Sequence, residues 1–155
     1  MRMPMEEDDW SLDLPEEWEE KEVAHLSLRA QVEFLPALGH FVRETAKALG
    51  LDQKSARELE HAVDEAATNV IQHAFPGGYG QYTLIILRRP GQVVAALEDR
   101  GIPFDLDKFR HGESTGLGYV LIKEYADELR VYNRGPQGKR LEIVNTPPPK
   151  GGGFG

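Results

Sequence analysis

Two polar residues four positions apart in the middle of the chain have the types and the spacing for chemistry. Glu65 and Asn69 lie in a stretch whose apolar residues recur at helical spacing, which predicts both side chains on one helix face. A carboxylate there can accept a proton or orient a water molecule, and an amide oxygen suits a hard cation such as Mg²⁺. The same pair is also common on the solvated edge of an ordinary helix, so the spacing leaves both interpretations open.

Two glycine-bearing segments add further chemistry. The first, DRGIPFD at 99–105, comes at the end of a predicted strand, where a buried Asp99 can accept a hydrogen bond from an exocyclic amine and Gly101 lets a flat ring approach the backbone. The second, STGLGY at 114–119, leads into a predicted helix, where free N–H groups and the helix dipole favour phosphate. Ordinary turn glycines would explain either segment taken alone.

Two histidines on the same predicted helix invite a metal-site interpretation, which the spacing rejects. His61 and His73 are twelve residues apart, and a rise of about 1.5 Å per residue separates them by roughly 18 Å. We expect His61 to point into solvent. His73 is predicted on the core side, as a hydrogen-bonded structural histidine.

Hydrophobic periodicity and turn residues predict the elements that hold these side chains. Pro36 suits the first turn of one helix, which Gly50 ends, and Asp52 is predicted to cap a second helix that runs to about Ala74. The predicted remainder is strands at 23–28, 82–89, 93–99, 129–132 and 141–144, a loop at 100–116 and a third helix at 117–125.

The order of these elements predicts the fold class. Strands pair as hairpins and helices occur in runs, which favours an α+β two-layer sandwich, with a mixed or antiparallel sheet covered on one face by three helices. A doubly wound parallel sheet would need strict alternation of strands and helices.

Charge divides the chain into unequal parts. The 155 residues carry a formal net charge of −8, and residues 1–22 account for all of it, with ten acidic residues against Arg2 and Lys21. We expect 1–22 to be a flexible acidic leader whose Trp10 and Trp18 leave open a docking role, 23–145 to be the folded domain, and 146–155 to be a flexible Pro/Gly tail.

Composition excludes several classes of protein. The folded part has balanced charge and no basic stripe, so direct nucleic-acid binding is not expected. Apolar runs are too short to span a membrane, and the acidic N-terminus does not read as a secretory signal. Cysteine is absent, which removes disulfides and thiolate sites. We therefore expect a cytoplasmic protein.

The motifs together resemble a known family. HAVDEAATNVIQHAF (61–75), DRGIPFD (99–105) and STGLGYVLIKEYADE (114–128) are similar to the N, G1 and G2 boxes of the GHKL ATP-binding superfamily. Within it, the chain resembles the bacterial anti-sigma-factor serine kinases of partner-switching pathways. The resemblance covers about residues 23–145 and implies the Bergerat ATP-binding fold, in agreement with the order of elements.

The resemblance implies a role for individual residues. Asn69 would coordinate Mg²⁺ against the ATP phosphates, and Glu65 would act as general base or orient the attacking hydroxyl. Asp99 would accept from the adenine amino group, with Gly101 beside the ring. The implied phosphate contacts are Thr115, Gly116, Leu117 and Gly118, with Lys108 and Arg110 as candidates from a lid at about 106–115.

The implied activity is a Mg·ATP-dependent serine/threonine protein kinase. Its implied partners are a small antagonist protein that it phosphorylates and a sigma factor that it sequesters, and relatives tend to be homodimers. One alternative is an ATP- or ADP-binding interaction module without phosphoryl transfer. Others are a detached sensor-kinase ATPase domain, which no preceding histidine-bearing helix supports, and a structural module without nucleotide.

One stretch departs from the family pattern. Many relatives open the last strand with a Gly-Thr pair whose hydroxyl lies near the nucleotide, whereas this chain has Gly138, Lys139 and Arg140. Whether Lys139 and Arg140 replace the lost contact is left open by the sequence.

Overall fold

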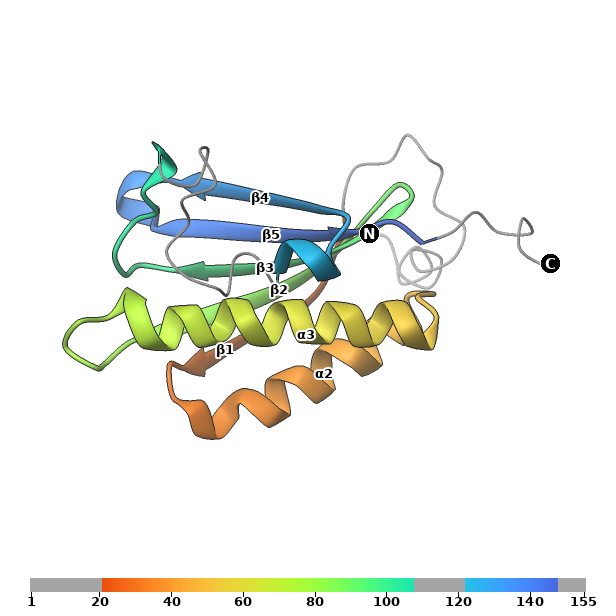
Figure 1. Ribbon diagram of the computed structural model, residues 1–155, viewed down its shortest axis with the longest axis horizontal. Helices are drawn as coiled ribbons and strands as arrows, with labels where there is room; N and C mark the ends of the chain where they lie inside the picture. The colour runs from red at the N-terminus through yellow and green to blue at the C-terminus, as the bar shows by residue number, and fades with distance from the viewer. Residues whose placement is uncertain (1–20, 108–121, 148–155) are drawn as a thin grey trace, which may run out of the picture.

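A five-stranded antiparallel sheet forms one layer of the computed structural model, which describes residues 21–107 and 122–147. Every neighbouring pair of strands is antiparallel, including the two pairs that were predicted as hairpins. Figure 1 shows the sheet packed against the helices. In spatial order the strands are β1 (Lys21–Arg29), β2 (Gln81–Arg89), β3 (Gln92–Asp99), β5 (Lys139–Asn145) and β4 (Glu128–Asn133).

Two long helices, α2 (Leu35–Ala48) and α3 (Gln53–Asn69), cover one face of this sheet (Figure 1). Pro36 lies in the first turn of α2, after a short 3₁₀ turn at Val32–Phe34. The side chain of Asp52 accepts a hydrogen bond from Ser55 N at 2.7 Å, so the predicted N-cap of α3 is confirmed.

The helix that was predicted to run to Ala74 changes its geometry near its end. Regular α-helix stops at Asn69, and Val70–Ala74 continue it as a π-helical turn. A π turn has about one more residue per turn than an α-helix, so side chains beyond it no longer follow the 100° spacing. For this reason the prediction for His73 is wrong: it is exposed and not on the core side.

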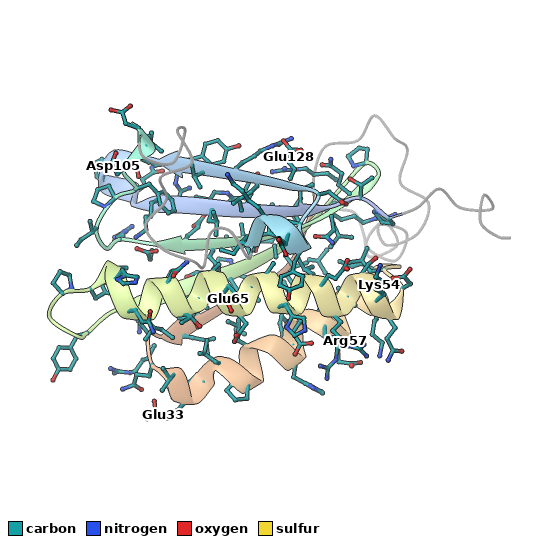
Figure 2. The ribbon with its side chains drawn as sticks, in the orientation of Figure 1. Glu33, Lys54, Arg57, Glu65, Asp105 and Glu128 are labelled. Atoms are coloured by element: carbon teal, nitrogen blue, oxygen red, sulfur yellow. The ribbon has the colours of Figure 1, made fainter. Side chains whose placement is uncertain are left out.

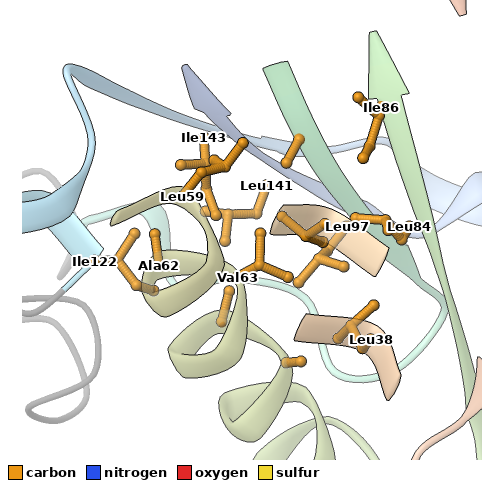
Figure 3. Close-up of a cluster of buried hydrophobic side chains, with 14 of the residues drawn as sticks. Leu38, Leu59, Ala62, Val63, Leu84, Ile86, Leu97, Ile122, Leu141 and Ile143 are labelled. Carbon is orange, nitrogen blue, oxygen red and sulfur yellow. The ribbon is translucent and has the colours of Figure 1, made fainter. Parts of the chain in front are cut away.

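The core lies between the helices and the sheet face they cover (Figure 3). Ala62, Ala66 and Ala67 are buried on α3, and these small side chains let the helix approach the strands closely. Ile122, in the short helical stretch at 122–125, also packs into this core. The larger fully buried side chains include Leu38, Leu59, Val63, Leu84, Ile86 and Ile143.

The opposite face of the sheet has its own small apolar cluster. Side chains alternate between the two faces of a strand, so the neighbours of the core residues point away from the helices. The cluster consists of Ile85, Leu87, Val94, Ala96 and Val144, all buried. Charged side chains of Glu98, Arg140 and Glu142 occupy the same face.

The remaining differences from the predicted elements are small. β1 begins at Lys21, two residues before the predicted strand. Residues 106–107 are already helical, so the predicted loop at 100–116 is not continuous. Only residues 122–125 of the predicted third helix lie in the described part, and they are helical. Within the described residues, no helix is long and apolar enough to cross a bilayer.

Candidate functional site

Three segments that are far apart in the sequence meet at one end of the sheet. Figure 1 shows α3 ending where β3 ends and β5 begins. A backbone hydrogen bond of 2.9 Å from Ile102 N to Ala74 O joins the loop after β3 to the end of the π-helical turn. The predicted polar residues of the N and G1 segments therefore lie on elements that converge here.

A row of paired residues crosses the last rung of the sheet on its helix-facing side. Tyr82 of β2 pairs with Asp99 of β3, Asp99 pairs with Lys139 of β5, and Lys139 pairs with Asn133 of β4. Directly paired residues of antiparallel strands share a face, so these four side chains form a continuous polar row. We call Tyr82, Asp99, Lys139 and Asn133 the terminal rung.

A buried ion pair lies at the centre of the terminal rung. Lys139 Nζ donates to Asp99 Oδ1 at 2.5 Å, and their side chains are only 9% and 2% exposed. The backbone N–H of Gly101 donates to the same Oδ1 at 2.8 Å. The predicted burial of Asp99 at a strand end is confirmed, and the lysine beside it is a partner that the motif did not predict.

Two glycines allow the backbones to meet at this point. A Cβ on Gly101 would lie 2.2 Å from the carbonyl oxygen of Ala74, so glycine is required for the loop to pack on the end of the π-helical turn. Gly138 has a φ of +89° and a ψ of −162°, a region essentially restricted to glycine. Its Cβ would lie 2.2 Å from the carbonyl oxygen of Asp99. Gly138 thus brings Lys139 directly alongside Asp99.

The loop after β3 is held against the far edge of the sheet. The Asn133 side chain makes two 2.9 Å hydrogen bonds to the backbone of Phe104, accepting from its N–H and donating to its carbonyl. The half-buried Phe104 ring packs against the core, and Lys139 Nζ lies 5.5 Å from its centroid. Lys139 is therefore held between a carboxylate and an aromatic face.

Glu65 and Asn69 occupy the last turns of α3, leading into the same end of the sheet. Figure 2 shows Glu65 on α3. Both residues are half-buried, and Asn69 is the last residue before the π-helical turn. Asn69 Nδ2 is a buried donor without a partner among the described residues, which is a costly state unless a ligand or water accepts from it.

The donor set at Asn69 fits Mg²⁺ only as a shared site. Among residues 21–107 and 122–147 there is no group of three or more metal-binding side chains. Mg²⁺ keeps several waters and often binds through one or two protein oxygens together with substrate phosphates. An amide oxygen on Asn69 with a carboxylate one turn away meets that requirement, whereas a protein-only cage is not present in this described part.

Tyr82 of the terminal rung interacts electrostatically with Asp64 of α3. Burial, followed by the negative charge of Asp64, raises the pKa of Tyr82 to about 12, and the Tyr82 hydroxyl is buried without a described partner. Burial also raises the pKa of Asp64. His61 is exposed, as predicted, with its ring 5.3 Å from that of Tyr125.

Several predicted site residues lie outside the described residues. These are Lys108, Arg110, Thr115, Gly116, Leu117 and Gly118. Of the predicted set, the structure brings Asp99 and Gly101 into direct contact and places Glu65 and Asn69 on the helix that leads to them.

Sequence reasoning missed Tyr82 as a site residue, and it left open whether Lys139 contributes to the site without predicting its pairing with Asp99. The two loop motifs carry no signal for either, because both come from other strands. The register of the strands would have found them: counting along the predicted hairpins places Asp99 opposite Tyr82, and the β3–β5 pairing places it opposite Lys139.

The chain resembles known proteins over most of its length. Residues 28–144 match the family described as the histidine kinase-like ATPase domain. A Bacillus cereus protein named serine-protein kinase RsbW is 21% identical over 123 residues, covering 71% of this chain and 77% of the relative. A Bacillus mycoides protein of the same name is 22% identical over 126 residues, covering 73% and 79%.

A solved structure has a similar fold. The crystal structure of the RsbU and RsbW domains of Rv1364c from Mycobacterium tuberculosis matches with a TM-score of 0.57 and 22% identity. The match covers 79% of this chain and 31% of that longer chain. At this identity the likeness concerns the fold: an antiparallel sheet with helices on one face.

Proposed function

This chain belongs to the histidine kinase-like ATPase domain family, and on that premise we propose that it is a serine/threonine protein kinase that uses ATP. The adenine base would lie at the terminal rung and the phosphates beside Asn69. The observation that carries this proposal is the convergence at one end of the sheet. α3 bears Glu65 and Asn69 and ends where the buried Asp99 lies.

Each residue has a role in the proposed reaction. Asp99 accepts from the 6-amino group of adenine, with Gly101 beside the ring. Asn69 would hold Mg²⁺ through its amide oxygen, and the chemistry supplied there would be neutralisation of charge on the phosphates. The backbone of 115–118 and the side chains of Lys108 and Arg110 are the proposed further phosphate contacts.

Glu65 handles the proton of the attacking hydroxyl. As the oxygen of a Ser or Thr side chain bonds to the γ-phosphorus, the bond from that phosphorus to the oxygen of ADP breaks, and the hydroxyl proton passes to the Glu65 carboxylate. The carboxylate has no hydrogen-bond partner among the described residues, so it is available for this role.

The names of the relatives indicate the class of partner for this proposed kinase. The curated relatives are named serine-protein kinases, which supports a protein substrate. We propose that the substrate is a small antagonist protein and that its phosphorylation controls a sequestered sigma factor or similar target, by partner switching. A homodimer is part of this proposal.

The test is Glu65→Gln, which removes the proton acceptor and keeps the shape. We expect Mg·ATP binding to persist, while phosphorylation of an antagonist domain by labelled ATP falls by about 10²–10⁴-fold. Glu58→Gln is the matched control, because Glu58 lies on the same face of α3 about 10 Å toward its start, paired with Lys54. Transfer at the wild-type rate in Glu65→Gln would overturn the base assignment. Binding without transfer in the wild type would favour the alternative, a nucleotide-operated interaction module.

A further inference from the structure

The buried ion pair of the terminal rung has unused hydrogen-bonding capacity on both partners. Both bonds to Asp99 reach Oδ1, and among the described residues nothing donates to Oδ2. Lys139 Nζ carries three N–H groups and donates one of them to Asp99, and the centroid of the Phe104 ring lies 5.5 Å from Nζ. The pair therefore presents one acceptor and one charged donor side by side.

Burial of the Asp99–Lys139 ion pair carries a desolvation cost that a purely structural role does not require. The two side chains are 2% and 9% exposed, and removing two charges from water costs as much as their attraction returns in many proteins. A pair of apolar side chains would fill the same positions without that cost. In ligand-binding sites a few precisely placed polar or charged groups in largely apolar surroundings fix the orientation of the ligand.

Backbone geometry holds Asp99 and Lys139 next to each other. The two residues are directly opposite in the β3–β5 register, and the positive φ of Gly138 brings the strand start against Asp99. The lysine amine is thus held within one hydrogen bond of the carboxylate that is proposed to read the adenine amino group.

We propose that Lys139 is a base-reading residue, whose Nζ donates to ring nitrogen N1 of adenine while Asp99 Oδ2 accepts from the 6-amino group. This inference rests on the proposed ATP site and deepens it. Adenine carries an acceptor, N1, next to a donor, the 6-amino group, which is the complement of the pair. In the same pose guanine presents O6 to the carboxylate and N1–H to the ammonium, so the pair discriminates against GTP.

The test needs no mutation in its first arm. Binding of ATP and of 1-deaza-ATP, which replaces N1 by a carbon, is measured by calorimetry on the full chain. A charge-assisted hydrogen bond to N1 predicts that 1-deaza-ATP binds about 10- to 100-fold more weakly. Equal affinities would overturn the proposal and leave Lys139 as a structural counter-ion.

The second arm removes the lysine. In Lys139→Met, ATP and 1-deaza-ATP should bind equally, while the preference for ATP should persist in the matched control Arg140→Met. Purine riboside triphosphate keeps N1 but lacks the amino group, so it should bind the wild type weakly and still lose affinity in Lys139→Met. A preference for ATP that survives in Lys139→Met would overturn the proposal.

The outcomes separate this inference from the proposed function. If the wild type binds neither nucleotide, the ATP site itself is wrong. If it binds both equally, the ATP site stands and the role of Lys139 fails. Should Lys139→Met not fold, the comparison of the two nucleotides on the wild type decides alone.

Discussion

Two cross-strand ion pairs lie back to back on adjacent rungs of the same two strands. Asp99 and Lys139 face the helices, whereas Glu98 and Arg140 are also paired and face the other side of the sheet. Alternation along β3 and β5 makes them neighbours in sequence and opposites in space. The two pairs differ in how completely their hydrogen-bonding groups are used.

Glu98 and Arg140, which we call the outer pair, belong to a network in which the charged side chains make more than one contact. Arg140 donates to Glu98 and, at 2.8 Å, to Glu142, while Arg89 donates to both oxygens of Glu142 at 3.1 and 3.2 Å. Arg134 adds a second contact to Glu98 at 3.3 Å. Asp99 and Lys139, the inner pair, share one hydrogen bond, and Asp99 accepts one further hydrogen bond from the backbone N–H of Gly101. A saturated network ties strands together, and an unsaturated buried pair is equipped to bind something else.

The largest predicted effect compares the loss of one cation from each pair. Lys139→Met leaves the Asp99 carboxylate buried and unpaired, so we expect the free energy of unfolding to fall by about 3–5 kcal/mol. Arg140→Met leaves Glu142 with Arg89 and Glu98 with Arg134, so we expect a loss of about 1 kcal/mol. Urea unfolding of both variants measures the difference. Equal losses would mean that the two pairs do not differ in the way described.

The next effect tests whether Gly138 sets the inner pair. Gly138→Ala places a Cβ against the Asp99 carbonyl in a backbone region that only glycine occupies readily, so we expect a loss of at least about 2 kcal/mol of unfolding free energy. Gly135→Ala is the control, since Gly135 also has a positive φ but open space around its Cβ, and about 1 kcal/mol is expected. A similar loss in both would remove the close approach as the cause.

A smaller effect separates recognition from structure. Asp99→Asn weakens the proposed acceptor for the adenine amino group, and a tenfold loss of affinity would remove about 1.4 kcal/mol of the stabilisation that saturating Mg·ATP provides. Glu98→Gln should leave that stabilisation unchanged, because Glu98 lies on the far face. Melting temperatures with and without Mg·ATP measure both. An unchanged ATP shift in Asp99→Asn would exclude this carboxylate from the binding site.

The smallest effect concerns pH and the outer network. Burial raises the pKa of Glu142, but hydrogen bonds from Arg89 and Arg140 outweigh burial and hold the pKa below its ordinary value of 4.5. The unfolded state then takes up the proton more readily, so the stabilisation is complete above pH 4.5 and is lost as the pH falls through the folded pKa. The free energies of unfolding of the wild type and of Glu142→Gln should converge as the pH is lowered below 4.5. A difference that does not change with pH would contradict this assignment.

Local signals in the sequence predicted much of the fold and part of the site. Alternating apolar residues predicted the strands, Asp52 predicted the start of α3, and the position of Asp99 after an apolar strand predicted its burial. These features depend on neighbours within a few residues, so a local pattern carries them.

Features that depend on distant partners escaped prediction. Lys139 is forty residues from Asp99, and its pairing with Asp99 follows only from how β3 and β5 pair. The π-helical turn after Asn69 interrupts the regular α-helical spacing of side chains. The predicted orientation of His73 was wrong because it assumed a continuous α-helix. Register and helix irregularity are properties of packing rather than of composition.

The two hydrogen bonds between Asn133 and the Phe104 backbone have a consequence for dynamics. They fasten the loop after β3 to the edge strand β4, two strands away from the strand that the loop leaves. Opening of the loop that exposes this amide must break a contact to β4. In native-state hydrogen exchange, the Phe104 amide should exchange together with the amides that pair β4 to β5, as one cooperative unit.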